Sequence, residues 1–565
     1  MKKKYFKTTI FVILGVFIGL LVYPLISGDN VYDQIKKYEY VFGTAIKEYV
    51  EEVDAGTLTE SAIKGLLNDL DPHSTYINVE DMKRVDEDMQ GSFEGIGVEF
   101  DVVKDTLTVI TPLKDGPSEK LGILSGDKII KVDGENVIGI SRERVPKLLR
   151  GDKGTKVTLH IKREGAKNLL VYEIIRDKIP QYSVDAYFIY DNSDIGIIQV
   201  NRFSQTTHTE LMQAARELQK QGMKKLILDL RGNPGGYLDQ AFLMADEFLA
   251  RDTIVYTKAR REYNNQVFTA RSGNSLENIP LIVLINAESA SASEIVSGAI
   301  QDMDRGLIVG TTSFGKGTVQ RQFKLSDGSA MRLTIAKYYT PSGRCIQRSY
   351  KDKNDYRRLV GRLELEEGAN LEHALDLIKK EEANKKANKK KGDKNDDNNI
   401  NLDSIELFYT RSGRVVLGGG GITPDYVVKN NDTVTDLTMN LLRKDIFRLF
   451  INADLKAGKD IKEYYNGDFK KFSKEFKLTD DYYKKLRATA EEEGIEWDEE
   501  QANIDKEYFE IRIKSMLART LWDRNRGQQI WSQAPWDRQL KKATELFPVA
   551  EKIRLNNKNI RDNKK

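Results

Sequence analysis

The spacing of hydrophobic residues along this 565-residue chain changes twice. A single all-α or all-β domain would keep one spacing throughout, so such a domain is excluded. Up to about residue 89 the apolar residues recur at three- and four-residue steps, which predicts helices. Residues 91–178 alternate over short stretches, which predicts a compact sheet with two short helices. From Ser193 onward, continuous apolar strands alternate with helical segments, which predicts a mainly parallel sheet buried on both faces. The chain is therefore predicted to be a multidomain α/β protein.

The composition argues against several classes of site and partner. The chain has one cysteine, Cys345, which is too few for an internal disulfide or a Cys-cluster metal site. The histidines are scattered and give no helix-borne metal pair; they are His73, His160, His208 and His373. A net charge of +3 on so long a chain gives no overall field for nucleic acid. We expect no metal, no cofactor and no nucleic-acid partner, and we interpret His73, in the turn Asp71-Pro72-His73-Ser74, as a capping or packing residue.

The N-terminus predicts a membrane anchor. Lysines at positions 2, 3, 4 and 7 precede an uncharged run from Thr8 to Gly28. As a helix this run spans roughly 30 Å, the thickness of a bilayer core. The lysines favour a cytoplasmic N-terminus, so all later residues are expected outside the cytoplasm. We expect residues 1–28 to be an uncleaved inner-membrane anchor and the catalytic part to lie in the cell envelope or periplasm; a cleaved signal peptide is the alternative.

The second half of the chain contains a charged linker and a helical extension. Residues 379–399 are low in complexity and rich in lysine and acidic residues, which favours a solvated linker over an anion-binding arm. A strand-like stretch with four consecutive glycines from Gly418 follows it. Residues from Thr433 to Lys565 are charged and helical in pattern, and their four tryptophans are expected to be packing residues: Trp497, Trp522, Trp531 and Trp536.

Glycine-bearing segments within residues 91–178 resemble those of a PDZ domain over its full length. They are Gly95-Ile96-Gly97-Val98, Gly116-Pro117, Gly122-Ile123-Leu124-Ser125-Gly126-Asp127 and Val132-Asp133-Gly134. The resemblance implies that the loop of Gly95, Ile96, Gly97 and Val98 binds the C-terminal carboxylate of a peptide through backbone N–H groups. A plain β-turn is the alternative interpretation of this glycine pair.

A run of small residues after a hydrophobic strand is the first catalytic candidate. The run is Glu288-Ser289-Ala290-Ser291-Ala292-Ser293-Glu294, and it leads into an amphipathic helix. A strand-to-helix turn of this kind projects a hydroxyl while the first helical N–H groups stay free to stabilise an oxyanion. Helix capping by serine is the commoner explanation of such a turn.

A second candidate segment contains a lysine between two glycines. Residues Gly310 to Lys316 match the first part of a phosphate-binding loop, but Gly317 stands where Ser or Thr should bind magnesium. The residues from Thr318 onward alternate like a strand, whereas a phosphate-binding loop opens a helix. We therefore reject the nucleotide interpretation. A lysine reached from a buried strand is instead desolvated, which lowers its pKa and leaves a neutral amine able to accept a proton from serine.

These segments together resemble the C-terminal processing peptidases, serine proteases of peptidase family S41 with a PDZ domain beside the catalytic core. The resemblance rests on Ser291-Ala292-Ser293-Glu294, Phe314-Gly315-Lys316-Gly317 with Gln320, and Asp229-Leu230-Arg231-Gly232-Asn233-Pro234-Gly235-Gly236. It covers roughly residues 30–430 and includes the helical preamble with Leu70-Asp71-Pro72-His73-Ser74.

The resemblance implies a role for each matching residue. Ser291 would be the nucleophile, Lys316 the general base and Gln320 the residue that orients the lysine. The N–H of Ala292 and an N–H in the Gly235-Gly236 turn would hold the oxyanion. Asp302 matches a possible relay position, although we expect a solvated carboxylate there. Ser289 and Ser293 are rival nucleophiles that spacing alone cannot separate from Ser291, and Glu288 departs from the small or polar residue of many relatives.

We therefore expect a membrane-anchored serine endopeptidase with a Ser–Lys dyad that recognises the C-termini of exported protein or peptide substrates through its PDZ domain. A PDZ adaptor with an inactive protease-like core is the alternative, and a homo-oligomer is possible. The expected parts are an anchor at 1–28, a helical region at 29–90, the PDZ domain at 91–178, a crotonase-like α/β protease core at 179–350 with a return segment at 404–430, a charged linker at 351–403 and a helical C-terminal extension at 431–565.

Overall fold

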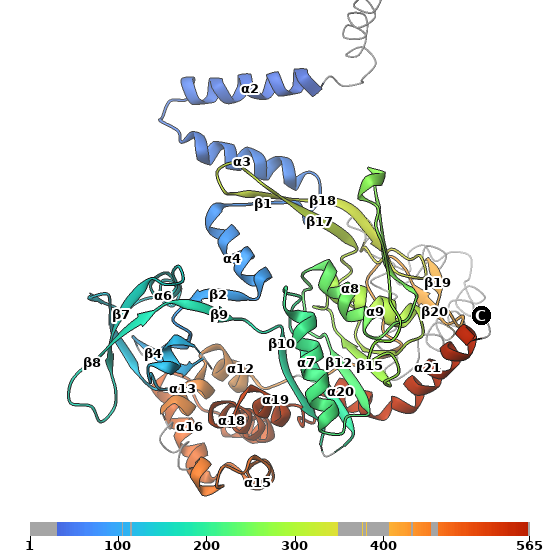
Figure 1. Ribbon diagram of the computed structural model, residues 1–565. Coiled ribbons are helices and arrows are strands. Elements are labelled where there is room, and N and C mark those ends of the chain that lie inside the picture. The colour runs from blue at the N-terminus through green and yellow to red at the C-terminus, as the bar shows by residue number, and fades with distance from the viewer. Residues whose placement is uncertain are drawn as a thin grey trace, which may run out of the picture. The chain divides into compact units, whose positions relative to one another are not determined.

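The computed structural model of the protein describes residues 31–348 and 406–562, apart from 104, 114–115, 192, 431–432 and 454–460, together with residues 376 and 380 (Figure 1). These residues divide into two compact units. One contains the residues up to Val79 and Arg321–Thr334, and the other contains Glu80–Gln320 and the residues from Ile335 onward. The anchor predicted at 1–28 lies outside the described residues, as does nearly all of the linker predicted at 351–403. No helix within the described ranges is long and apolar enough to cross a bilayer.

The first unit begins with two helices, α2 (Val31–Glu48) and α3 (Ala55–Asn68), which confirm the helical period of this region. Asp54 caps α3, because its carboxylate accepts a hydrogen bond from the N–H of Thr57 at 2.7 Å. The helix therefore begins directly after an aspartate whose side chain binds an N–H group of the first helical turn.

A turn and a short strand follow α3. The carboxylate of Asp71 accepts hydrogen bonds from the His73 N–H at 2.8 Å and the Ser74 hydroxyl at 2.7 Å, which confirms the predicted turn. β1 (Thr75–Ile77), which the helical period did not predict, pairs antiparallel with residues 330–332 of β18 (Ala330–Tyr339).

The second unit opens with α4 (Val79–Gln90), which belongs to it from Glu80, and with the sheet predicted as a PDZ domain. The sheet order is β3-β4-β5-β7-β8 with β6 beside β5, and β2 pairs with β9. Its elements are β2 (Ser92–Gly95), β3 (Val98–Val103), β4 (Thr106–Pro112), α5 (Pro117–Lys120), β5 (Lys128–Val132), β6 (Glu135–Asn136), α6 (Val145–Leu149), β7 (Lys156–Lys162), β8 (Leu170–Ile175) and β9 (Asp177–Pro180). On β7, Val157, Leu159 and Ile161 are fully buried, so the alternation in the sequence marks one buried face. The predicted compact sheet with two helices is confirmed.

A six-stranded sheet of order β10-β11-β12-β15-β16-β21 forms the catalytic candidate region. β10 runs antiparallel to β11, and the remaining neighbours are parallel, as predicted. The strands are β10 (Val184–Ile189), β11 (Ile195–Val200), β12 (Lys225–Asp229), β15 (Leu281–Ile285), β16 (Leu307–Gly310) and β21 (Tyr426–Val427). α7 (Thr207–Lys220), α8 (Leu238–Asp246) and α9 (Ala292–Asp302) alternate with these strands. A smaller antiparallel sheet contains β13 (Thr253–Ala259), β14 (Val267–Thr269) and residues 336–339 of β18.

Both faces of the large sheet are covered, by helices from different parts of the chain. Ile198, Leu228 and Val283 point to the face covered by α7, α8 and α9. Their neighbours along the strands point to the opposite face, where they pack against α20 (Arg538–Glu545) and α21 (Phe547–Asp562). The last two helices thus form a layer of the core, a role that the predicted separation of an extension at 431–565 did not include. Buried Leu, Ile and Phe side chains of this kind each contribute about 1.5–3 kcal/mol to stability.

The rest of the C-terminal region is a helical cluster with its own apolar core. It consists of α12 (Asp436–Arg443), α13 (Ile446–Ala453), α15 (Phe469–Glu475), α16 (Asp480–Glu492), α17 (Glu499–Ile504), α18 (Lys506–Leu521) and α19 (Arg524–Trp531). Phe472, Leu486 and Phe509 are fully buried in this core. Trp497 and Trp522 pack against it, and the rings of Trp531 and Trp536 lie 5.6 Å apart. The expectation that the four tryptophans are packing residues is confirmed.

Candidate active site

Ser291 stands at the N-cap of α9, on the turn that follows the buried strand β15. Its φ of +54° and ψ of −109° lie in a region that residues with a side chain rarely adopt, and such strain concentrates at functional turns. The rival serines are fully buried and already engaged. The Ser289 hydroxyl donates to the carbonyl oxygen of Leu230, and the Ser293 hydroxyl donates to that of Asn233, each at 2.9 Å. Of the three hydroxyl groups, only that of Ser291 belongs to a residue that is partly exposed.

Glu294 joins the serine turn to the lysine loop. One oxygen of its buried carboxylate accepts hydrogen bonds from the N–H groups of Ser291 at 2.8 Å and Lys316 at 2.9 Å. The other oxygen accepts from the Ser313 hydroxyl at 2.5 Å and from the Gly315 N–H at 2.7 Å. Burial raises the pKa of Glu294, and these four hydrogen bonds oppose the shift without cancelling it. No role was predicted for Glu294, although a Ser followed three residues later by Glu is the pattern of a capping box.

Tyr338 makes a second connection between the same two segments. Its hydroxyl lies 2.5 Å from the carbonyl oxygen of Lys316 and 3.2 Å from that of Ser291, so a single proton serves both acceptors. The side chain is 1% exposed, and burial raises the pKa of Tyr338 well above its usual value. The hydroxyl therefore stays protonated and remains a donor. Nothing in the sequence pattern pointed to this residue, because β18 contributes it from another sheet.

The lysine loop leads into a strand, as predicted. Residues after β16 pass through Gly315, Lys316 and Gly317 and enter β17 (Thr318–Lys324), so no helix follows the lysine. This geometry confirms the rejection of a phosphate-binding loop. Gln320 lies on β17, and its side-chain amide donates to the Thr318 hydroxyl at 2.8 Å. Thr318 and Gln320 share one face of the strand because side chains alternate. The orienting role of Gln320 stays a prediction.

The glycine turn after β12 packs directly against Ser291. A Cβ atom on Gly235 would lie 2.9 Å from the Cβ of Ser291, so only glycine fits there. The N–H of Gly235 already donates to the side-chain oxygen of Asn233 at 2.9 Å. The Gly235 N–H is thus engaged within its own turn, and the oxyanion role of Gly236 stays a prediction. Ala292, the other predicted donor, is the first residue of α9, where backbone N–H groups have no intrahelical partner.

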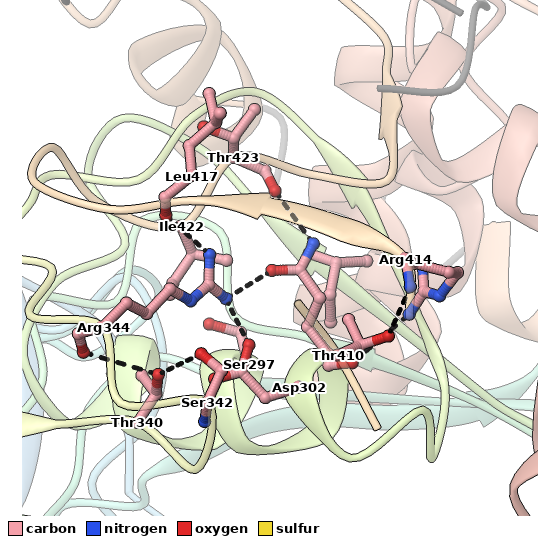
Figure 2. Close-up of polar contacts among 12 residues, drawn as sticks. Ser297, Asp302, Thr340, Ser342, Arg344, Thr410, Arg414, Leu417, Ile422 and Thr423 are labelled. Carbon is pink, nitrogen blue, oxygen red and sulfur yellow. Dashed lines mark hydrogen bonds and ion pairs between the residues drawn. The ribbon is translucent and has the colours of Figure 1, made fainter. Parts of the chain in front are cut away.

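Asp302 lies at the opposite end of α9 from Ser291, about 16 Å away along the helix at 1.5 Å per residue. It is 2% exposed, so the expectation of a solvated carboxylate is wrong. Figure 2 shows its place beside Arg344, whose guanidinium donates to Asp302 at 2.7 Å and to the carbonyl oxygen of Leu417 at 2.9 Å. The backbone N–H of Ser342 donates to the other carboxylate oxygen at 3.0 Å. The structure places Asp302 in a buried ion pair and not beside the serine turn.

A cavity of about 900 Å³ opens at the carboxyl ends of the parallel strands. In sheets of this kind ligands bind at that edge, where loops from several strands meet. Gly232 and Glu288 line the cavity from the glycine turn and the serine turn, and Trp531, Trp536 and Asp537 line it from the C-terminal region. We call it the sheet-edge cavity. Among the described residues, no three His, Cys, Asp or Glu side chains gather as metal ligands.

The predicted peptide-binding loop lies between β2 and β3 of the smaller domain. Gly97 has φ of +72°, and a Cβ atom there would lie 3.0 Å from the side chain of Ile179. Ile96 is 2% exposed and packs in the core of this domain, and its carbonyl oxygen accepts from the Ser118 hydroxyl at 2.6 Å. Val98 begins β3, which is an edge strand of the sheet order. Such an edge is where a peptide extends a PDZ sheet.

Comparisons with known proteins match four segments of this chain. Residues 194–354 match the model of peptidase family S41, residues 95–172 match the PDZ domain, and residues 26–81 match the N-terminal domain of the activating protease CtpB. Residues 437–523 match a family of unknown function. The carboxy-terminal-processing protease of Bartonella bacilliformis is 38% identical over 351 residues, which are 60% of this chain and 80% of that protein.

Two further relatives extend the comparison. The carboxy-terminal processing protease CtpA of Bacillus subtilis is 38% identical over 324 residues, which are 57% of this chain and 68% of that protein. A solved structure, the photosystem II D1 C-terminal processing protease, is 31% identical with a TM-score of 0.32, covering 54% of this chain and 82% of that one.

Proposed function

This chain belongs to the family of carboxy-terminal processing proteases, and from this premise we propose that it is a serine endopeptidase in which Ser291 is the nucleophile and Lys316 the general base. The observation that carries the proposal is the position of Glu294. Its single buried carboxylate binds the backbone N–H groups of both residues, so the two backbones are held to one fixed point. Two segments 25 residues apart in sequence thereby become one site.

The proposed reaction passes through an acyl-enzyme. The Ser291 hydroxyl oxygen attacks the scissile carbonyl carbon while the neutral amine of Lys316 accepts its proton. The N–H groups of Ala292 and Gly236 stabilise the oxyanion, and the lysine then returns the proton to the leaving amine. Water, deprotonated by the same amine, hydrolyses the ester and frees Ser291. Gln320 is proposed to orient the lysine side chain.

The substrates are proposed to be exported proteins or peptides with accessible C-termini. The loop at residues 95–98 and the edge strand β3 support this proposal, because together they provide backbone groups for a carboxylate and for an added strand. The basic, apolar N-terminus supports an anchored protease whose catalytic part lies in the cell envelope outside the cytoplasm.

Substitution of the dyad tests this function. We expect the full chain, purified in detergent, to cleave an unfolded protein, and Ser291→Ala and Lys316→Ala each to reduce the rate by roughly 10³-fold or more. Lys324→Ala, a lysine at the far end of β17, is the matched control and should retain activity. Circular dichroism checks that the variants are folded. Cleavage that persists in both variants would refute the dyad, and binding of C-terminal peptides without cleavage by the wild type would favour a peptide-binding adaptor.

A further inference from the structure

Arg231 connects the glycine turn to the C-terminal region. Two of its guanidinium nitrogens donate to Asp229 at 2.9 and 2.7 Å, and two donate to Asp537 at 2.7 and 3.0 Å. Gln539 accepts a further hydrogen bond at 3.2 Å. The partners lie 306 positions apart in the chain, so only the fold brings them together.

This cluster is largely buried, although its three charged residues also line the sheet-edge cavity. The side chains of Arg231, Asp229 and Asp537 are 15%, 6% and 13% exposed. Burial by itself would lower the pKa of Arg231, but the two carboxylates outweigh burial and raise it. A buried guanidinium between two carboxylates is held in one position by both of them. If either carboxylate were removed, the buried positive charge would be only partly neutralised.

Short contacts join the residues after Arg231 to the serine turn. The next residue, Gly232, donates its N–H to the side-chain oxygen of Asn286 at 2.9 Å. One residue further, the carbonyl oxygen of Asn233 accepts from the Ala290 N–H at 3.0 Å. These two contacts hold the residues that directly follow Arg231 against the serine turn.

The helix that carries Asp537 is anchored by other contacts. Asp537 caps α20, accepting from the Leu540 N–H at 3.0 Å, and the side chains of Leu540 and Ala543 are buried against the large sheet. An asparagine at position 537 would therefore leave α20 in place, and would remove both the charge facing Arg231 and one of the two oxygens that accept from it.

We propose that Asp537 is a positioning residue for the active site: through Arg231 it fixes the glycine turn that supplies the oxyanion donor. The proposal rests on the function proposed above for Ser291 and gives residues after 431 a part in catalysis. Because small displacements of groups that stabilise a transition state cost large factors in rate, the effect should appear in kcat and much less in KM.

The test uses Asp537→Asn in the full chain, with Asp523→Asn as the matched control. Both aspartates cap helices of the C-terminal region, and asparagine is an equally good cap, but only Asp537 contacts Arg231. We expect Asp537→Asn to lower kcat for a peptide and the labelling rate of Ser291 by a fluorophosphonate roughly tenfold or more, with KM changed less than about threefold. Asp523→Asn should stay within about twofold of wild type, and Asp537→Glu should recover most of the rate because it restores the charge.

The outcomes separate this inference from the function on which it rests. If Ser291→Ala cleaves and labels like the wild type, the proposed nucleophile fails. If Ser291→Ala is inactive and Asp537→Asn matches the wild type in kcat, Asp537 is no positioning residue. An equal loss in Asp537→Asn and Asp523→Asn would also overturn the inference, because it would show a general effect of the caps. Should Asp537→Asn not fold, Asp537→Ser, which keeps a capping oxygen, takes its place with the same expected loss.

Discussion

At the scale of single residues, two buried side chains turn two sequence motifs into one site. Glu294 binds the backbone N–H groups of Ser291 and Lys316, and Tyr338 lies within hydrogen-bonding distance of their carbonyl oxygens. Three of the four groups that contact the Glu294 carboxylate are backbone N–H groups, which can only donate, so the ionised carboxylate fits this site best. Protonation would place a donor against donors and weaken the connection.

We therefore predict that activity falls on acidification while the protein remains folded. Because burial raises the pKa of Glu294, this carboxylate takes up a proton at a higher pH than an ordinary glutamate does. A raised folded-state pKa contributes stability that is present at low pH and lost as pH rises through that pKa, so protonation of Glu294 does not itself unfold the protein. We expect fluorophosphonate labelling of Ser291 to fall with pH while circular dichroism stays constant.

Glu294→Gln should reproduce the protonated state at every pH, because an amide cannot accept at both of its ends. We expect roughly 10²-fold slower labelling near neutral pH, with Glu262→Gln, an exposed glutamate of the same unit, as the unchanged control. Wild-type labelling by Glu294→Gln would show that the bridging carboxylate is dispensable.

At the scale of elements, the large sheet depends on helices that the sequence places far from it. Along each strand, successive side chains point to opposite faces of the sheet. One face is covered by α7, α8 and α9, and the other by α20 and α21. Without them the side chains of Ile197, Ile227 and Ile282 would face water, and exposure of such apolar side chains costs about 1.5–3 kcal/mol each. The final helices are therefore part of the protease core.

Leu540→Ala should destabilise this core. Leu540 on α20 is 1% exposed, and truncation of a buried leucine costs about 2–5 kcal/mol. The neighbouring exposed residue provides the control, Lys541→Ala, for which we expect a change below about 0.5 kcal/mol. Urea unfolding curves of the full chain measure both. Equal midpoints would mean that α20 does not support the sheet in solution.

At the scale of the whole molecule, buried ion pairs join the end of α9 and the turn after it to residues on either side of a long intervening stretch of chain. Arg344 pairs with Asp302, and Arg414 pairs with Asp304 at 2.7 Å and Asp425 at 2.5 Å. These contacts attach the segment around β19 (Leu407–Tyr409), β20 (Val415–Leu417) and β21 to the catalytic sheet. The predicted return segment at 404–430 supplies the last strand of this sheet in the described structure.

Asp302→Asn distinguishes a structural role of this network from a catalytic relay. Arg344 would remain fully buried without a charged partner, so we expect a loss of about 3–5 kcal/mol in the free energy of unfolding. The labelling rate of Ser291 per folded molecule should stay close to wild type. Asp239→Asn, an exposed aspartate at the start of α8, is the control for both measurements. Slow labelling at full stability would instead support the relay.

The kinds of secondary-structure element could be predicted from the order of the amino acids, and the roles of the site residues stay predictions. Hydrophobic period distinguished the helical region, the small antiparallel sheet and the parallel sheet, because period follows from backbone geometry alone. The strand after Gly317 separated a lysine loop from a phosphate-binding loop for the same reason. The N-terminal run that predicted the anchor lies outside the described residues.

Which groups lie in contact became known from the three-dimensional fold alone. The capping-box pattern predicts that the Glu294 carboxylate binds the N–H of Ser291. It does not predict that the same carboxylate also binds groups of the lysine loop. The apolar stripe of α20 predicts that one face of this helix is buried, but it does not identify the surface against which that face packs. Asp537 gave no local signal at all, since a carboxylate at a helix start has a sufficient explanation as a cap. Partners distant in sequence are fixed by packing, and packing depends on the whole chain at once.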